Sequence, residues 1–179
     1  MSVFTNPSDG SPANASAYTA GLLELLGPRD ARDVLRSTVS VLSGRIAAIP
    51  HDALRVPEAP GKWSIIEVVQ HLADSELVAG WRYRMAIAHD RPAITGFDQD
   101  LWATRLGYDA ADRDEALLQF AVLRRANVRL LDSQPPAALG RVAVHAERGE
   151  ESVAHMMKLY AGHDLLHLRQ IERIAKVVL

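Results

Sequence analysis

The spacing of hydrophobic residues along this chain is typical of α-helices, and almost no segment alternates as a β-strand would. Over residues 153–178, positions expected to face inward recur every three or four residues, as they do on one face of a helix. Similar spacing predicts helices over about 29–49, 65–88 and 112–132. The inward positions of the last helix are Met156, Tyr160, His163, His167, Ile171, Ile174 and Val178. The expected fold class is all-α, a four-helix bundle.

The helix predicted over 65–88 begins with a full set of capping signals. Ser64 stands at the N-cap, Glu67 follows three residues later as its capping-box partner, and Trp63 precedes the cap as a hydrophobic staple. Glu67 also precedes His71 by one helical turn, so it is an alternative candidate for a general base. The capping role is the favoured interpretation because it explains Glu67 without catalysis.

Proline and glycine mark the connections between the predicted helices. Gly27-Pro28 separates a short helix around residues 18–26 from the first long helix. The long segment 89–111 is expected to cross between the second and third helices of the bundle. Residues 139–149 contain a brief alternation that predicts a small hairpin.

The composition is that of one globular domain. The chain has 179 residues, of which 48% are hydrophobic, enough for a sizeable core. Residues 1–28 are expected to form an N-terminal tail with the short helix, and residues 29–179 a single bundle domain. The net charge of −2 and the lack of a basic run argue against a nucleic-acid partner.

Two further absences narrow the location and the chemistry. No apolar run reaches the ~18 residues that a membrane span needs, and the N-terminus lacks the basic start and apolar core of a signal peptide. We therefore expect a cytoplasmic protein with no membrane partner. The chain has no cysteine, which excludes disulfides and a protein thiolate nucleophile.

Three histidines are the candidate metal ligands. His163 and His167 lie four residues apart on the last helix, on one face and about 6 Å apart along its axis. His71 on the second helix would complete a three-nitrogen site with an open position. Asp74, three residues after His71, is a candidate to accept a ring N–H from a ligand histidine, or else a solvated surface acid. Spacing alone leaves open that the histidines are hydrogen-bonded core residues.

Three blocks of sequence, in order, resemble the DinB-like superfamily, and within it the YfiT-type metal-dependent hydrolases. The blocks are Gly61-Lys62-Trp63-Ser64 with Glu67 and His71-Leu72-Ala73-Asp74-Ser75-Glu76, then Arg91-Pro92 through Trp102, then Gly162-His163-Asp164-Leu165-Leu166-His167. The resemblance covers about residues 29–178. It implies a four-helix bundle that binds nickel or zinc through His71, His163 and His167, and it makes a homodimer plausible.

Three functions are compatible with these residues. In the first, a metal ion with an open position activates water, and the protein is a hydrolase of a small-molecule substrate. In the second, which the resemblance also implies, a low-molecular-weight thiol of the bacillithiol or mycothiol type is transferred to an electrophile. In the third, the metal only stabilises a binding or stress-response protein. A zinc protease with Asp164 as its base is disfavoured, because the chain leaves little room for a further ligand after His167.

Overall fold

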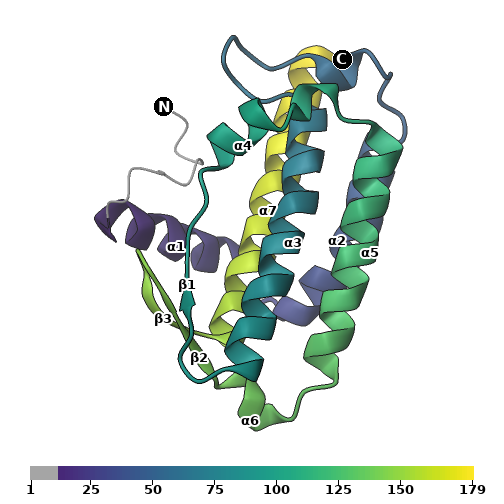
Figure 1. The fold of residues 1–179 in the computed structure, drawn as a ribbon. Helices are drawn as coiled ribbons and strands as arrows, with labels where there is room; N and C mark the ends of the chain where they lie inside the picture. The colour runs from purple at the N-terminus through teal and green to yellow at the C-terminus, as the bar shows by residue number, and fades with distance from the viewer. Residues whose placement is uncertain (1–11) are drawn as a thin grey trace.

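The computed structural model describes residues 12–179, and the part of the predicted tail before residue 12 lies outside the described residues. Four long helices form a bundle, and shorter elements cover one side and one end of it (Figure 1). In chain order the elements are α1 (Pro12–Leu26), α2 (Ala31–Ile46), η1 (Ala53–Arg55), α3 (Ile65–Ala88), β1 (Ala93–Ile94), α4 (Gln99–Arg105), η2 (Tyr108–Ala110), α5 (Arg113–Asp132), α6 (Pro136–Leu139), β2 (Val142–His145), β3 (Gly149–Ser152) and α7 (Val153–Val178).

The bundle helices run up, down, down and up. One apolar cluster joins the C-terminal halves of α2 and α7 to the N-terminal halves of α3 and α5. A second cluster joins the opposite halves of the same four helices. Helices α2 and α7 therefore run in one direction and α3 and α5 in the other. The two parallel neighbours α3 and α5 need a long crossover between them, as the sequence predicts.

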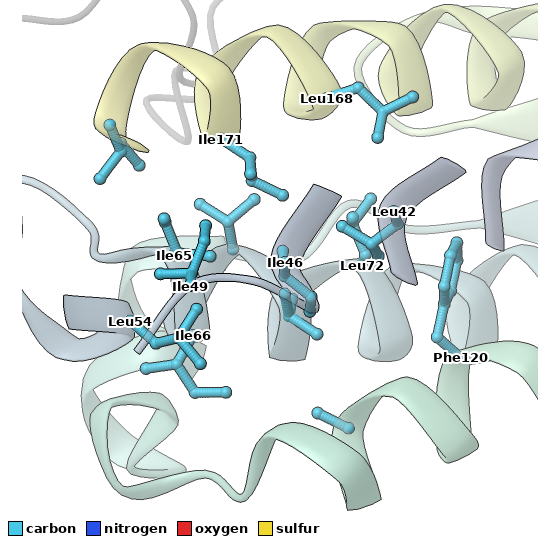
Figure 2. Close-up of a cluster of buried hydrophobic side chains, with 14 of the residues drawn as sticks. Leu42, Ile46, Ile49, Leu54, Ile65, Ile66, Leu72, Phe120, Leu168 and Ile171 are labelled. Carbon is cyan, nitrogen blue, oxygen red and sulfur yellow. The ribbon is translucent and has the colours of Figure 1, made fainter. Parts of the chain in front are cut away.

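The first apolar cluster closes the end of the bundle where α3 begins (Figure 2). Leu168 and Ile171 of α7 point toward Ile65 and Leu72 of α3, and Phe120 of α5 closes one side. These side chains are almost completely buried. Burial of an aliphatic side chain contributes roughly 1.5–3 kcal/mol, so this layer anchors the start of α3 firmly.

The crossover carries structure that sequence patterning did not predict. Its strand β1 pairs in parallel with β2, with Ala93 opposite Val144, and β2 pairs with β3 in an antiparallel hairpin. A hairpin was predicted within residues 139–149; the observed one spans 142–152, and it gains a third strand from the crossover. Tyr108, farther along the crossover, is buried against α3.

Helix α1 is longer than the predicted helix at 18–26, and it lies across the bundle against α7 (Figure 1). The two helices meet at Gly162, where an added Cβ would lie 2.2 Å from the carbonyl oxygen of Leu22. Only glycine permits this approach. Among residues 12–179, none of the helices is both long and apolar enough to cross a membrane.

Candidate metal centre

A layer of polar side chains crosses the middle of the bundle between the two apolar clusters. On each bundle helix the residues that belong to one cluster are separated from those of the other by buried polar residues. These buried polar residues are Thr38 on α2, Asp74, Ser75 and Glu76 on α3, Arg124 and Asn127 on α5, and His163, Asp164 and His167 on α7; His71 lies one turn before Ser75, beside Leu72 of the first cluster. Polar groups buried this deeply must find partners inside the protein or in a bound ligand.

The start of α3 sets the position of His71. The amide N–H and the hydroxyl of Ser64 both donate to a carboxylate oxygen of Glu67, at 2.7 and 2.8 Å. This capping box fixes the first turn of the helix. The Trp63 ring then packs 5.0 Å from the His71 ring, centroid to centroid. Glu67 is therefore engaged as a cap, the role favoured from the sequence.

The structure brings His71, His163 and His167 together, with their Nε2 atoms facing one point. The Nε2 atom of His163 lies 3.1 Å from that of His71 and 3.0 Å from that of His167. One ring nitrogen from each histidine lies within 4.8 Å of the other two, and all three residues are buried. The Ser75 hydroxyl, one turn after His71, lies 3.3 Å from the same His71 nitrogen.

All three rings are neutral at neutral pH. Burial, followed by the positive charge of Arg124, lowers the pKa of His163 to about 3. Burial also holds the pKa values of His71 and His167 well below the usual range, and repulsion between the histidines lowers them further. Metal ligands must be neutral imidazoles, so the site needs to release few protons when a cation enters.

The tautomer of His167 is set by Gln170. The Nδ1 atom of His167 lies 2.7 Å from the amide oxygen of Gln170, so Nδ1 carries the proton and donates it. The lone pair of His167 is then on Nε2 and faces the other two rings. By contrast, the buried Nδ1 of His71 has no hydrogen-bond partner within residues 12–179.

The donor set fits a divalent transition-metal ion. Two nitrogens bound to one ion at about 2.0–2.1 Å with tetrahedral angles lie about 3.3 Å apart, close to the 3.0 and 3.1 Å found here. Three neutral nitrogens packed this closely cannot all hydrogen-bond to one another, because each pair needs one N–H and one lone pair. A shared cation accepts all three lone pairs at once. Imidazole ligands suit zinc, copper, iron and nickel ions.

Asp74 is not brought to the histidines. Its carboxylate accepts hydrogen bonds from the Tyr108 hydroxyl at 2.6 Å and from the amides of Gln119 and Gln70 at 3.1 and 3.2 Å. No hydrogen bond joins it to a ligand histidine within the described chain. Asp74 is also not the solvated acid considered from the sequence, because Tyr108 covers it from the crossover.

Asp164, beside His163, is held by Arg124 instead of facing the site. The Arg124 guanidinium donates to both Asp164 oxygens, at 2.6 and 3.0 Å, and its Nε lies 2.9 Å from Glu76. Asn127 donates to Glu76 from the other side, and burial raises the pKa of Glu76. Arg124 therefore links the two helices that carry the histidines, and Asp164 is not free to act as a base.

A pocket opens beside the three histidines. His71 and His163 line it together with Ser75, Arg82 and the Tyr160 ring, and its cavity volume is about 60 Å³. Apolar walls come from Leu22, Phe97, Met156 and Leu159, and α1 covers it with Tyr18 and Thr19. Of the aromatic residues in the sequence, Tyr160 lines the pocket, Trp102 packs on Phe97, and Trp81 is exposed elsewhere.

Fold and site together define a four-helix-bundle protein with a buried three-histidine centre of the kind that binds metals. The chain belongs to the DinB superfamily, whose profile matches residues 34–171. It is similar to a protein of Bacillus mycoides named "Putative metal-dependent hydrolase", with 30% identity over 73% of this chain and 75% of the relative. A protein of the same name from Oceanobacillus iheyensis is 27% identical over 76% of this chain and 78% of the relative.

The fold is shared with a solved structure. YfiT from Bacillus subtilis, described as having an unusual four-helix bundle topology, superposes with a TM-score of 0.77 over 82% of this chain and 84% of its own. The sequence identity is 22%. The predicted all-α bundle with its long crossover is thus confirmed, and the small three-stranded sheet is an addition to it.

Sequence reasoning missed several residues that surround the site. Gln170 and Ser75 follow a ligand histidine by three and four residues, the distances at which helix neighbours touch, so this spacing could have revealed both. Arg82 follows His71 by three turns on the same helix face. This spacing is a weaker signal, because in the sequence Arg82 cannot be told from the ordinary surface arginines. Its role depends on partners from three other segments, which no local pattern predicts.

Proposed function

We propose that this chain is a metal-dependent hydrolase of a small-molecule substrate, with one zinc or nickel ion held by His71, His163 and His167. The convergence of three buried, neutral Nε2 atoms at the wall of a pocket is the observation that carries the proposal. The names of the Bacillus and Oceanobacillus relatives support the same reaction class. A cytoplasmic location, expected from the sequence, is part of the proposal.

The residues of the chain have distinct parts in this function. When bound, the ion would polarise a substrate oxygen and lower the pKa of a bound water. Gln170 keeps the lone pair of His167 directed inward. The Ser75 hydroxyl, beside His71, can position a polar group of the substrate by hydrogen bonding. The apolar pocket walls exclude bulk water and bind the uncharged part of the substrate.

The first test is metal content. Elemental analysis of the untagged protein, dialysed against trace-metal-free buffer, should find about one zinc or nickel per chain. His71→Ala, His163→Ala and His167→Ala should each lose it, while His89→Ala, which removes an exposed histidine, should keep it. Wild-type protein that binds no divalent ion even after reconstitution would refute the proposal.

The second test separates hydrolysis from thiol transfer. Metal-loaded protein is screened against esters, amides and halogenated electrophiles, with and without a low-molecular-weight thiol. Turnover that needs the metal but no added thiol supports the hydrolase. Turnover that requires the thiol would instead assign the protein to thiol transfer. No turnover by metal-loaded wild type, together with a loss of thermal stability in the histidine variants, would leave the metal a structural role.

A further inference from the structure

Arg82 is a buried cation in the pocket, and no carboxylate of residues 12–179 pairs with it. The residue is 5% exposed and lines the same pocket as His71 and His163. Its Nη1 donates to the Tyr160 hydroxyl at 3.0 Å, and its Nη2 donates to the Thr95 carbonyl at 2.6 Å. Both acceptors are neutral. Within residues 12–179, Arg82 forms no ion pair, and its buried Nε has no hydrogen-bond partner.

The other charged groups near Arg82 are already paired with one another. Arg148, the second arginine of the pocket, donates to both oxygens of Glu151, at 2.6 and 2.9 Å. Glu76 is bound by Arg124 and Asn127. Each of these carboxylates is thus held by another arginine, and within residues 12–179 none of them forms an ion pair with Arg82.

The remaining neighbours of Arg82 are neutral at neutral pH. His145 Nε2 lies 3.5 Å from Arg82, and burial, helped by Arg148 and Arg82, lowers the pKa of His145 to about 4. Burial raises the pKa of Tyr160, so its hydroxyl stays protonated. A charge buried without a counter-charge is unfavourable unless a ligand supplies one.

We propose that Arg82 and Tyr160 form a subsite for a carboxylate, so that the substrate is a small carboxylic acid with an apolar body. This inference rests on the proposed function and adds the substrate class to it. A single arginine without a carboxylate partner matches a monoanion better than a phosphate dianion, and its planar guanidinium has N–H groups to spare for a carboxylate. Because Tyr160 accepts from Arg82, its own proton is free to donate to the same ligand.

The residues that line the pocket suit such a molecule. Its apolar walls, Leu22, Phe97, Met156 and Leu159, lie among the same lining residues as the two ends. His71 and Arg82 are three turns apart on α3, about 16 Å between their Cα atoms along the helix axis. Side chains on a helix lean toward its N-terminus, which brings the Arg82 guanidinium back toward His71. A ligand that reaches both ends would place its acid group at Arg82 and Tyr160, and the Tyr160 ring lies 6.4 Å from the His163 ring, centroid to centroid.

The inference is tested by comparing a carboxylate with its neutral analogue. Hexanoate and 4-phenylbutyrate, their amides, and inorganic phosphate are titrated calorimetrically into wild type, Arg82→Gln and Tyr160→Phe at pH 7. Arg84→Gln is the matched control, because Arg84 is an exposed arginine of the same helix that bonds Gly80 and Asn127 outside the pocket. Each protein is measured both metal-loaded and metal-free.

Wild type and Arg84→Gln should bind the carboxylates at least 10-fold more tightly than the amides and should bind phosphate more weakly than either acid. Arg82→Gln should abolish this preference while it retains the metal. Tyr160→Phe, which keeps the shape of the ring, should reduce it about 3-fold or more, so the test stands even if Arg82→Gln does not fold. Equal affinity for acid and amide in wild type would overturn the inference.

The variant His163→Ala distinguishes binding of the acid at the histidines from binding at Arg82 and Tyr160. This variant should lose the metal but keep the preference for carboxylates over amides. If it loses that preference while Arg82→Gln keeps it, the acid binds at the histidines and the inference is wrong. Absence of metal from wild type would sink the proposed hydrolase yet leave the carboxylate preference of metal-free protein intact, so the two failures are distinguishable.

Discussion

Acidification of the metal-free protein should destabilise it well above the pH at which carboxylates titrate. The pKa of His163 is about 3 in the folded state, because burial and Arg124 disfavour the imidazolium, against about 6.5 in the unfolded chain. Between these values the unfolded chain binds a proton that the folded protein does not. Stability therefore falls as pH decreases from about 6.5, at about 1.4 kcal/mol per pH unit for this residue.

Between pH 7 and pH 5, His163 alone accounts for a loss of about 2 kcal/mol in the free energy of unfolding. His71 and His167 have lowered pKa values too and act in the same direction. Glu76, whose pKa burial raises, opposes them where the folded protein takes up its proton. The total unfolding free energy of a domain is only about 5–15 kcal/mol, so the loss is easily measured.

The assay is urea denaturation of metal-free protein at pH 7.0, 6.0 and 5.0, followed by circular dichroism. Wild type should lose at least ~2 kcal/mol over this range. His163→Gln should show a slope smaller by about 1.4 kcal/mol per pH unit, whereas His89→Gln, an exposed control, should match wild type. Stability that does not change between pH 7 and 5 would refute the claim that these histidines are buried and neutral.

Three further predictions concern packing, charge and metal. Gly162→Ala should lower the free energy of unfolding by about 1–3 kcal/mol in thermal unfolding, because its Cβ would strike the backbone of Leu22. Gly44→Ala, with open space around it, should be neutral or stabilising. Equal effects of the two substitutions would contradict the tight contact of α1 with α7. Arg124→Ala should lower the free energy of unfolding by about 3–5 kcal/mol in chemical denaturation, since it leaves Glu76 and Asp164 buried without an arginine partner. Arg125→Ala, at an exposed position, should change stability by less than about 0.5 kcal/mol. A divalent ion at 100 times its Kd should stabilise wild type by about 2.7 kcal/mol in scanning calorimetry, and a similar gain in His167→Ala would argue against the site.

The sequence predicted the elements that depend on local signals. The capping box at Ser64 and Glu67 placed the start of α3 correctly, and the three-to-four spacing placed α7 at its observed bounds. The first bundle helix was predicted over 29–49 but spans Ala31–Ile46. It starts later because Asp30 caps it by accepting from the amides of Arg32 and Asp33. The three histidines meet as predicted, since two share a helix face and the third follows a well-defined helix start.

What the sequence did not predict depends on contacts between distant segments. The polar residues before Tyr18 resemble a tail, yet α1 begins at Pro12 because packing on α7 supplies stability that intrinsic propensity does not. The two-residue strand β1 pairs with a partner some fifty positions away, too short a pattern to detect. Asp74 was within one helical turn of His71, but Tyr108, delivered by the crossover, determined its partner.

Helix α5 supplies no histidine to the site, yet its Arg124 holds the two histidine-bearing helices in place. Its guanidinium spans carboxylates from the two helices that carry the histidines, so the separation of those helices does not depend on a bound ion. A rigid chelator of this kind orders little of its own chain when it takes up a cation, and the entropy lost on binding is small. The three histidine nitrogens also keep a fixed spacing, so the site would select ions by their radius and preferred geometry. One ion could then replace another without opening of the bundle.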